Sequence, residues 1–160
     1  MISVLIVDDE LLIRETLTHY IQWSELGVDT VLMAADGNKA LEIIRSDQPD
    51  IILSDIKMPH MNGIQLAQIV KESFPDICFA ILSGYADKEY LKEAIYLHLD
   101  AYIEKPINLE EISTLVRSLV SECRKKKEQA EHIAEACKNA QAVVTSVQKE
   151  DKKIAPPKLY

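Results

Sequence analysis

Three aspartates are the residues of this sequence whose type and spacing most directly suggest chemistry. Asp8 and Asp9 follow the apolar stretch Val4–Val7, and Asp55 follows the apolar stretch Ile51–Ser54. Carboxylates that converge repel one another, and one of them is driven to take up a proton unless a cation lies between them. A ligand set of oxygens alone, without Cys or His, suits Mg²⁺. The pattern therefore predicts a magnesium site that uses Asp8, Asp9 and Asp55.

Two further polar residues, Ser83 and Lys105, also come directly at the ends of apolar stretches. A lysine ammonium can hold a phosphate oxygen, and a serine hydroxyl can donate a hydrogen bond to one. An aspartate can act as a nucleophile and form an aspartyl phosphate when a metal and a cation stabilise the transferring group. We predict Asp55 as this acceptor because it stands alone after its strand, whereas Asp8 and Asp9 form a pair suited to hold the ion.

The elements that must position these residues are five repeats of strand and helix. Strands are predicted at 2–7, 30–34, 51–54, 77–83 and 101–104, and helices at 11–22, 37–46, 63–73, 88–97 and from 109 onward. This alternation predicts an α/β fold in which βα units surround a parallel sheet covered on both faces. Ligands of such doubly wound sheets bind beyond the carboxyl ends of the strands, which is where all the candidate residues fall.

Composition and charge narrow the class of protein. The chain has 160 residues, 48% of them hydrophobic, which fits one globular domain with a tail, and no apolar run approaches the roughly 20 residues of a membrane helix. The N-terminus lacks a basic signal-peptide region and the three cysteines form no C-x-x-C pair, so we expect reduced thiols and a cytoplasmic location. Residues 1–108 carry 18 Asp/Glu against 8 Lys/Arg, so direct DNA binding would need a further domain.

The C-terminal part has a different period. Apolar or small residues recur in three-four spacing, interrupted at Lys126, at 112, 116, 119, 123, 130, 133, 137, 140, 144 and 147. This spacing predicts a coiled-coil seam and therefore a homodimer through the last helix, with parallel and antiparallel pairing both open. We predict a globular domain at 1–122, a coiled-coil extension at 123–150 and a flexible tail at 151–160.

Four motifs in chain order resemble the receiver domains of two-component response regulators. They are VDDE at 7–10, DIKMP at 55–59 with a glycine at 63, LSGYAD at 82–87 and YIEKP at 102–106. The resemblance covers roughly residues 2–120. It implies a flavodoxin-like (βα)5 fold with strand order 2-1-3-4-5. One departure is His60, which stands where many relatives have glycine.

The resemblance also implies a role for each residue at the acceptor site. Asp55 would accept a phosphoryl group from a sensor histidine kinase. Asp9, assisted by Asp8 through water, and the main-chain carbonyl of Lys57 would bind Mg²⁺. Lys105 would pair with the phosphate. The protein would be a phosphoacceptor with weak self-phosphorylation and autodephosphorylation, and not a turnover enzyme.

Switching would involve residues behind the acceptor. Ser83 would move to meet the phosphate and Tyr102 would rotate inward, which would alter the face made by the fourth helix, the fifth strand and the fifth helix. Lys57 and Tyr85 occupy the variable positions that influence phosphate lifetime in the family. The Lys105–Pro106 bond is expected to be cis.

The output of the switch has two open interpretations. IQWSELG at 21–27 and the heptad region resemble the subgroup whose receivers precede an arabinose-regulator-type helix-turn-helix domain, which would regulate transcription. The chain is then either a receiver-plus-linker part of a longer regulator or a stand-alone receiver that acts through protein–protein contacts. An enzyme-class alternative, a Mg²⁺-dependent phosphohydrolase with an aspartate nucleophile, usually requires D-x-D after the first strand, and DDE does not supply it.

Overall fold

The computed structural model of the chain describes the backbone of residues 1–153 and the side chains of residues 1–84 and 87–147. The chain divides into two compact units, Met1–Arg124 and Lys125–Tyr160. Of the predicted tail at 151–160, residues 151–153 continue the last helix, and the remainder lies outside the described residues. Among residues 1–153 there is no helix with both the length and the apolar character needed to cross a membrane.

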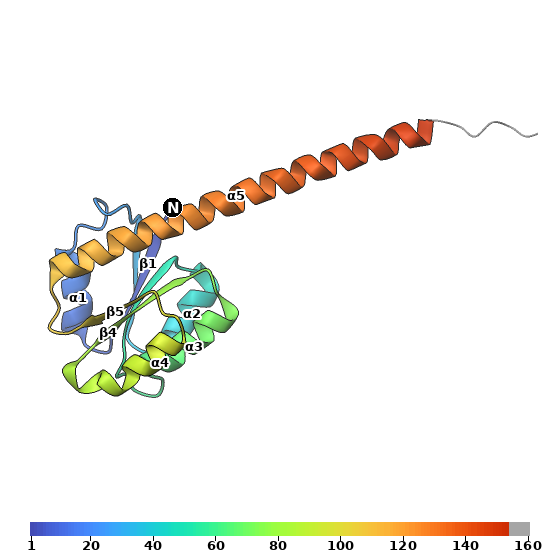
Figure 1. Ribbon diagram of the computed structural model, residues 1–160. Coiled ribbons are helices and arrows are strands. Elements are labelled where there is room, and N and C mark those ends of the chain that lie inside the picture. The colour runs from blue at the N-terminus through green and yellow to red at the C-terminus, as the bar shows by residue number, and fades with distance from the viewer. Residues whose placement is uncertain (154–160) are drawn as a thin grey trace, which may run out of the picture. The chain divides into compact units, whose positions relative to one another are not determined.

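A five-stranded parallel sheet forms the centre of the first unit (Figure 1). Its strands are β1 (Ser3–Val7), β2 (Thr30–Ala34), β3 (Ile51–Asp55), β4 (Cys78–Ser83) and β5 (Ala101–Glu104). They lie in the order β2-β1-β3-β4-β5 with every neighbouring pair parallel, which confirms the predicted doubly wound topology. Because Val7 pairs with Ser54 across β1 and β3, the next residues in the two segments, Asp8 and Asp55, lie at the same edge of the sheet.

Helices cover both faces of the sheet, which explains why its strands are almost wholly apolar. The helices are α1 (Leu11–Tyr20), α2 (Gly37–Asp47), α3 (Gly63–Ser73), α4 (Leu91–Tyr96) and α5 (Leu109–Lys153), with a 3₁₀ helix, η1 (Tyr85–Tyr90), before α4. One core cluster joins the sheet to α1 and the first turns of α5, through residues such as Leu17 and Val116. The other joins it to α2, α3 and α4, for example through Ile44 and Leu66.

The fourth helix differs from the prediction of one helix at 88–97. The chain first winds as η1, because the Asp87 main-chain N–H donates to Gly84 O at 3.0 Å and the Asp87 carboxylate accepts the Gly84 N–H at 2.8 Å. Only then does α4 begin, and it is short. The chain leaves it at His98, which has a φ of 53° in the left-handed region. The local side-chain capping of a tight turn thus replaced the expected first helical turn.

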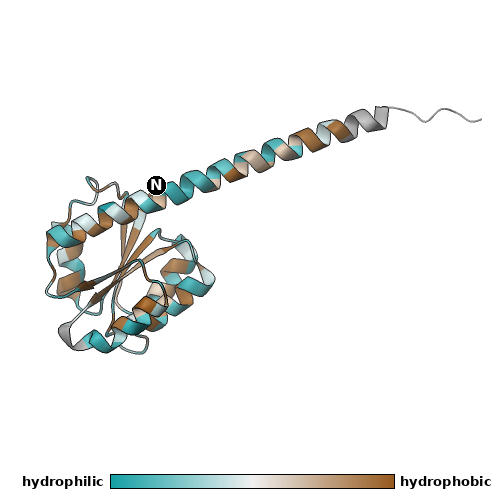
Figure 2. Ribbon diagram, viewed as in Figure 1, coloured by the Kyte–Doolittle hydropathy of each residue, from teal (hydrophilic) through white to brown (hydrophobic). Residues whose placement is uncertain are grey.

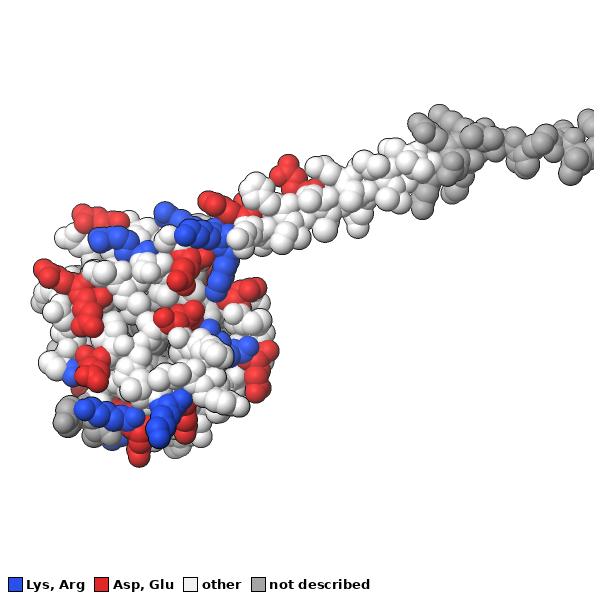
Figure 3. Space-filling view, viewed as in Figure 1, with Lys and Arg blue, Asp and Glu red and all other residues white. Residues whose placement is uncertain are grey.

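The heptad pattern in α5 covers two physically different segments. Ile112, Val116, Leu119 and Cys123 are buried in the core of the first unit, where the Cys123 Sγ lies 3.4 Å from the Cys78 Sγ. The sequence pattern alone assigned these four positions to an intermolecular seam. Their burial within the first unit shows that they are not part of one. Later apolar positions of the repeat are exposed. Residues 139–147 carry no Asp, Glu, Lys or Arg, so this stretch of the helix is white in Figure 3, and it is partly brown, or hydrophobic, in Figure 2.

Candidate functional site

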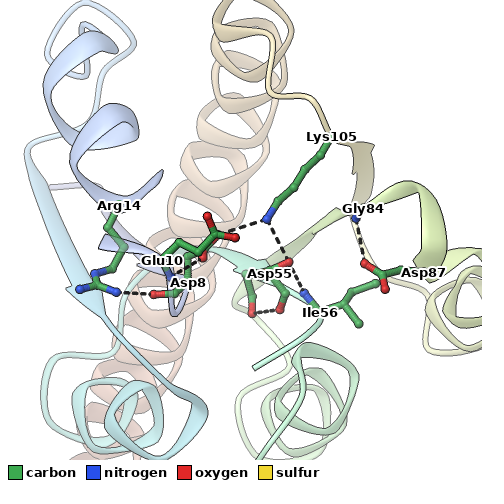
Figure 4. A network of polar contacts seen from close by, with 9 residues as sticks. Asp8, Glu10, Arg14, Asp55, Ile56, Gly84, Asp87 and Lys105 are labelled. Carbon is green, nitrogen blue, oxygen red and sulfur yellow. Dashed lines mark hydrogen bonds and ion pairs between the residues drawn. The ribbon is translucent and has the colours of Figure 1, made fainter. Parts of the chain in front are cut away.

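Asp55 lies at the centre of the carboxyl edge of the sheet. It is the last residue of the central strand β3 and is 5% exposed. Its Oδ1 accepts the Ile56 main-chain N–H at 2.8 Å and lies 3.2 Å from the Lys105 Nζ (Figure 4). A Cβ on Gly63, the first residue of α3, would collide with the Asp55 carbonyl, so the helix can approach the acceptor strand only with a glycine there.

Asp8 faces Asp55 from the neighbouring strand end. It is fully buried, and its Oδ1 accepts the Glu10 N–H at 2.9 Å, so it also caps the turn that leads into α1. Its Oδ2 lies 3.4 Å from the Lys105 Nζ. Arg14 donates to the Asp8 main-chain oxygen at 2.6 Å and holds this turn from the side of α1. The Lys105 ammonium thus bridges the two buried carboxylates.

The three aspartates form a candidate site for a divalent cation. Asp8, Asp9 and Asp55 each offer a carboxylate oxygen, and these oxygens lie within 4.8 Å of one another. Asp9 is exposed while the other two are buried, so the cluster opens to solvent on one side. The donors are all hard oxygens, which fit Mg²⁺ with retained water. The Lys57 carbonyl, predicted as a further ligand, stays a prediction.

Burial and mutual repulsion make the unliganded carboxylates hold their protons more tightly. Burial and the nearby charge of Asp8 raise the pKa of Asp55 from 3.8 to about 6, against the opposing effect of the Lys105 ammonium. Burial likewise raises the pKa of Asp8. For Lys105, burial lowers the pKa, but the two carboxylates outweigh it and raise the pKa overall. One ammonium therefore does not compensate the buried negative charge, and a further cation would.

Ser83 and Tyr102 lie on the strands beside the acceptor. Ser83 ends β4 one residue beyond the pair formed by Asp55 and Leu82, and its Oγ is buried without a hydrogen-bond partner among the described residues. A buried hydroxyl in this state is a donor available to an incoming acceptor. Tyr102 in β5 is partly exposed, and its hydroxyl donates to the Asp87 main-chain oxygen at 3.5 Å.

The loops of the site contain the predicted backbone features and one residue that sequence reasoning missed. The Lys105–Pro106 bond is cis, as expected, and His60 has a φ of 69°, where glycine is favoured. The missed residue is Asp87, which is 3% exposed and forms an ion pair with Lys57 at 3.1 Å. The signal was available in LSGYAD, because an acidic residue three positions after Gly84 can accept the Gly84 N–H, as the third residue of a capping box does.

This arrangement defines a doubly wound α/β protein with an acidic, lysine-bridged site at the carboxyl edge of its sheet. Comparison with known families agrees, since residues 4–117 match the family described as "Response regulator receiver domain". The chain therefore belongs to the response-regulator receiver family. The resemblance and the fold predicted from the sequence are confirmed.

Similar structures and relatives support the same assignment. The crystal structure of a two component transcriptional regulator AraC from Clostridium phytofermentans has a TM-score of 0.75 and 37% identity, over 79% of this chain and 98% of that one. The REC domain of AraT, a response regulator from Geobacillus stearothermophilus, has a TM-score of 0.68 and 34% identity, over 81% of this chain and 97% of that one.

Two curated relatives are longer than this chain. The transcriptional regulatory protein HptR of Staphylococcus aureus is 32% identical over 151 residues, which are 94% of this chain and 59% of HptR. The uncharacterized transcriptional regulatory protein YesN of Bacillus subtilis is 34% identical over 125 residues, 78% of this chain and 34% of YesN. The chain thus spans between about a third and three fifths of the length of these relatives.

Proposed function

We propose that this chain is the phosphoacceptor of a two-component pair and that Asp55 accepts its phosphoryl group from a phosphohistidine of a sensor kinase. The observation that carries the proposal is the convergence of three carboxylate oxygens within 4.8 Å, two of the residues being bridged by Lys105. An Asp55 oxygen attacks the phosphorus, the P–N bond to the imidazole breaks, and an acyl phosphate forms on Asp55. Asp8, Asp9 and the Lys57 carbonyl would hold Mg²⁺, which would supply charge neutralisation for the transferring group.

The residues around Asp55 have distinct tasks in this transfer. A pKa of about 6 leaves Asp55 largely ionised, and nucleophilic, at neutral pH. Lys105, already 3.2 Å from Asp55, pairs with a phosphoryl oxygen. The buried Ser83 hydroxyl donates to another once it moves toward the acceptor. The chain performs this step once per cycle and is not a turnover enzyme.

The output of the switch is the α4–β5–α5 face, with Ser83 and Tyr102 as the moving residues. Exposed apolar side chains on α4, among them Ile95 and Tyr96, make this face suitable for contact with another protein. In a longer parent protein an arabinose-regulator-type helix-turn-helix domain would follow and bind DNA, as the greater length of the relatives favours. The cytoplasm, whose reducing conditions suit the cysteine thiols, is the expected compartment.

A homodimer through α5 beyond Arg124 completes the proposal. In this segment Ile133, Val144 and Val147 are each more than half exposed, and their spacing fits a second copy of the same helix. Cys137 is exposed on the same stripe, so mild oxidation would cross-link a parallel dimer there and leave an antiparallel one uncross-linked. Sedimentation tests the dimer, because a monomer at tens of micromolar would contradict it.

The acceptor chemistry is tested by intact mass. Incubation with Mg²⁺ and acetyl phosphate is expected to add the mass of one labile phosphoryl group to the wild type and none to Asp55→Asn. Asp76→Asn, an exposed aspartate before β4, is the matched control and should be modified like the wild type. No adduct on the wild type would contradict the acceptor role, and rapid hydrolysis of phosphoesters would favour the phosphohydrolase.

A further inference from the structure

One ion pair joins the two loops that flank the acceptor. The Lys57 Nζ lies 3.1 Å from the Asp87 Oδ1, so the loop after β3 is tied to the turn after β4. The two partners differ sharply in environment, since the Lys57 side chain is 62% exposed and that of Asp87 is 5% exposed. The buried carboxylate of Asp87 needs the opposite charge of Lys57 beside it. The exposed Lys57 side chain has few other contacts that fix its position.

Asp87 is the residue through which the turn after β4 is held. Its Oδ2 accepts the Gly84 N–H at 2.8 Å, and its main-chain N–H donates to Gly84 O at 3.0 Å. Its main-chain oxygen accepts the Tyr102 hydroxyl at 3.5 Å. Its Oδ1 makes no hydrogen bond among the described residues, which leaves the Lys57 ammonium as its compensating contact. The turn directly follows Ser83, so its position and that of Ser83 are coupled.

We propose that the Lys57–Asp87 ion pair is a latch that holds the segment from Gly84 to Tyr90 in its resting arrangement, and that a phosphoryl group on Asp55 releases it. Lys57 is thus a positioning residue, which acts on the turn through Asp87. This inference rests on the proposed function for its trigger, but the resting latch does not depend on phosphorylation.

Charge supplies the trigger. With a divalent cation bound, the three aspartates, Lys105 and the cation sum to about zero before transfer. A phosphoryl group replaces one carboxylate charge by roughly two, so the sum becomes about −1 after transfer. Lys57, only two residues from Asp55 and with a mostly exposed side chain, is the nearest further cation in the sequence. Its ammonium moves toward the new charge, and Asp87 loses the partner that its buried oxygen needs.

Hydrogen exchange of the segment 84–90 tests the resting latch in the unphosphorylated protein. Lys57→Met keeps the length of the side chain and removes its charge, and it is expected to speed exchange of this segment about two- to fivefold, the range for one partly exposed ion pair. Lys39→Met, which removes an exposed charge on α2, is the matched control and should leave the segment unchanged. Equal exchange in wild type, Lys57→Met and Lys39→Met would overturn the latch.

A double-mutant cycle separates the latch from general loosening. Asp87→Asn keeps an acceptor for the Gly84 N–H but removes the charge, so in this background Lys57→Met should have little further effect. Additive effects of the two substitutions would overturn a direct coupling.

The trigger is tested in the same protein after acetyl phosphate treatment, with intact mass recorded in parallel. Modification should speed exchange of the segment 84–90 in the wild type, and it should speed it less in Lys57→Met, where the ion pair is already absent. An adduct that leaves exchange unchanged overturns the trigger. A missing adduct overturns the proposed function together with the trigger, while the resting comparison of Lys57→Met still decides the latch.

Discussion

The two units of this chain use the same apolar spacing in opposite ways. Val116 and Val144 lie in one helix, four heptads apart, at the same position of the repeat, yet the first is fully buried and the second is 55% exposed. Val116 packs against β-strand residues of its own unit. Val144 has no such burial, so its apolar surface is available to another chain. The comparison teaches that a heptad pattern predicts a helix with an apolar stripe but does not say what covers the stripe.

The largest expected effect tests this contrast directly. Val116→Asp places a charge in the buried core and should destabilise the first unit by about 4 kcal/mol or more. This loss is enough to abolish its cooperative unfolding transition. Val144→Asp should leave the thermal midpoint of that unit unchanged and prevent dimer formation. Thermal unfolding and sedimentation of the two variants measure this. Similar destabilisation by both substitutions would show that Val144 is also packed within its own chain.

The second prediction concerns the carboxyl edge of the sheet, where the first unit buries the carboxylates of Asp8 and Asp55 close together. Because the pKa of Asp55 is raised to about 6, the folded state binds more protons than the unfolded state between pH 3.8 and about 6, and stability falls as pH rises through that window. Without divalent cations, Asp55→Asn should stabilise the protein at pH 7 by about 1–3 kcal/mol and flatten this pH dependence. Urea unfolding in EDTA between pH 4 and 7 measures both. A variant less stable than the wild type at pH 7 would contradict the prediction.

Metal addition should also stabilise the wild type, because a cation relieves the repulsion among the same carboxylates. A cation that binds only the folded carboxylates stabilises the wild type by about 2 kcal/mol at roughly thirtyfold excess over its dissociation constant. Asp9→Asn should reduce the Mg²⁺-dependent rise of the thermal midpoint, and Asp76→Asn should retain it. A wild-type midpoint that does not respond to millimolar Mg²⁺ would argue against the aspartate cluster as a cation site.

The smallest expected effects come from substitution by glycine, which should stabilise one region of the chain and destabilise the other. His60 has a φ of 69°, so His60→Gly relieves left-handed strain and should stabilise the first unit by about 0.5 kcal/mol after the entropy of the unfolded glycine is counted. Ala134→Gly, within the regular helix after Arg124, should instead reduce helix stability by about 1 kcal/mol. Urea unfolding checks the first and circular dichroism the second. Destabilisation by His60→Gly would mean that the imidazole makes contacts that outweigh the strain.

The sequence by itself determined the fold class and most of the residues at the carboxyl edge of the sheet. Apolar runs and turn residues are local signals, and a parallel sheet brings the ends of its strands together whatever else the chain does. The strand ends alone therefore place Asp8, Asp55 and Lys105 at one edge. Boundaries that depend on side-chain capping were less predictable. The indole of Trp23 donates to Leu17 O at 2.9 Å near the end of α1, which ended two residues earlier than predicted.

Only the tertiary structure decided which residues share a contact across segments. That Lys57 meets Asp87, that the Ser83 hydroxyl is buried without a partner among the described residues, and that Cys123 packs on Cys78 are results of how loops and helices approach the sheet. No periodicity encodes them, because each depends on how segments far apart in the chain pack together. The same reason explains α5, whose apolar repeat extends on both sides of Lys126 while the sheet that buries its first turns covers only part of it.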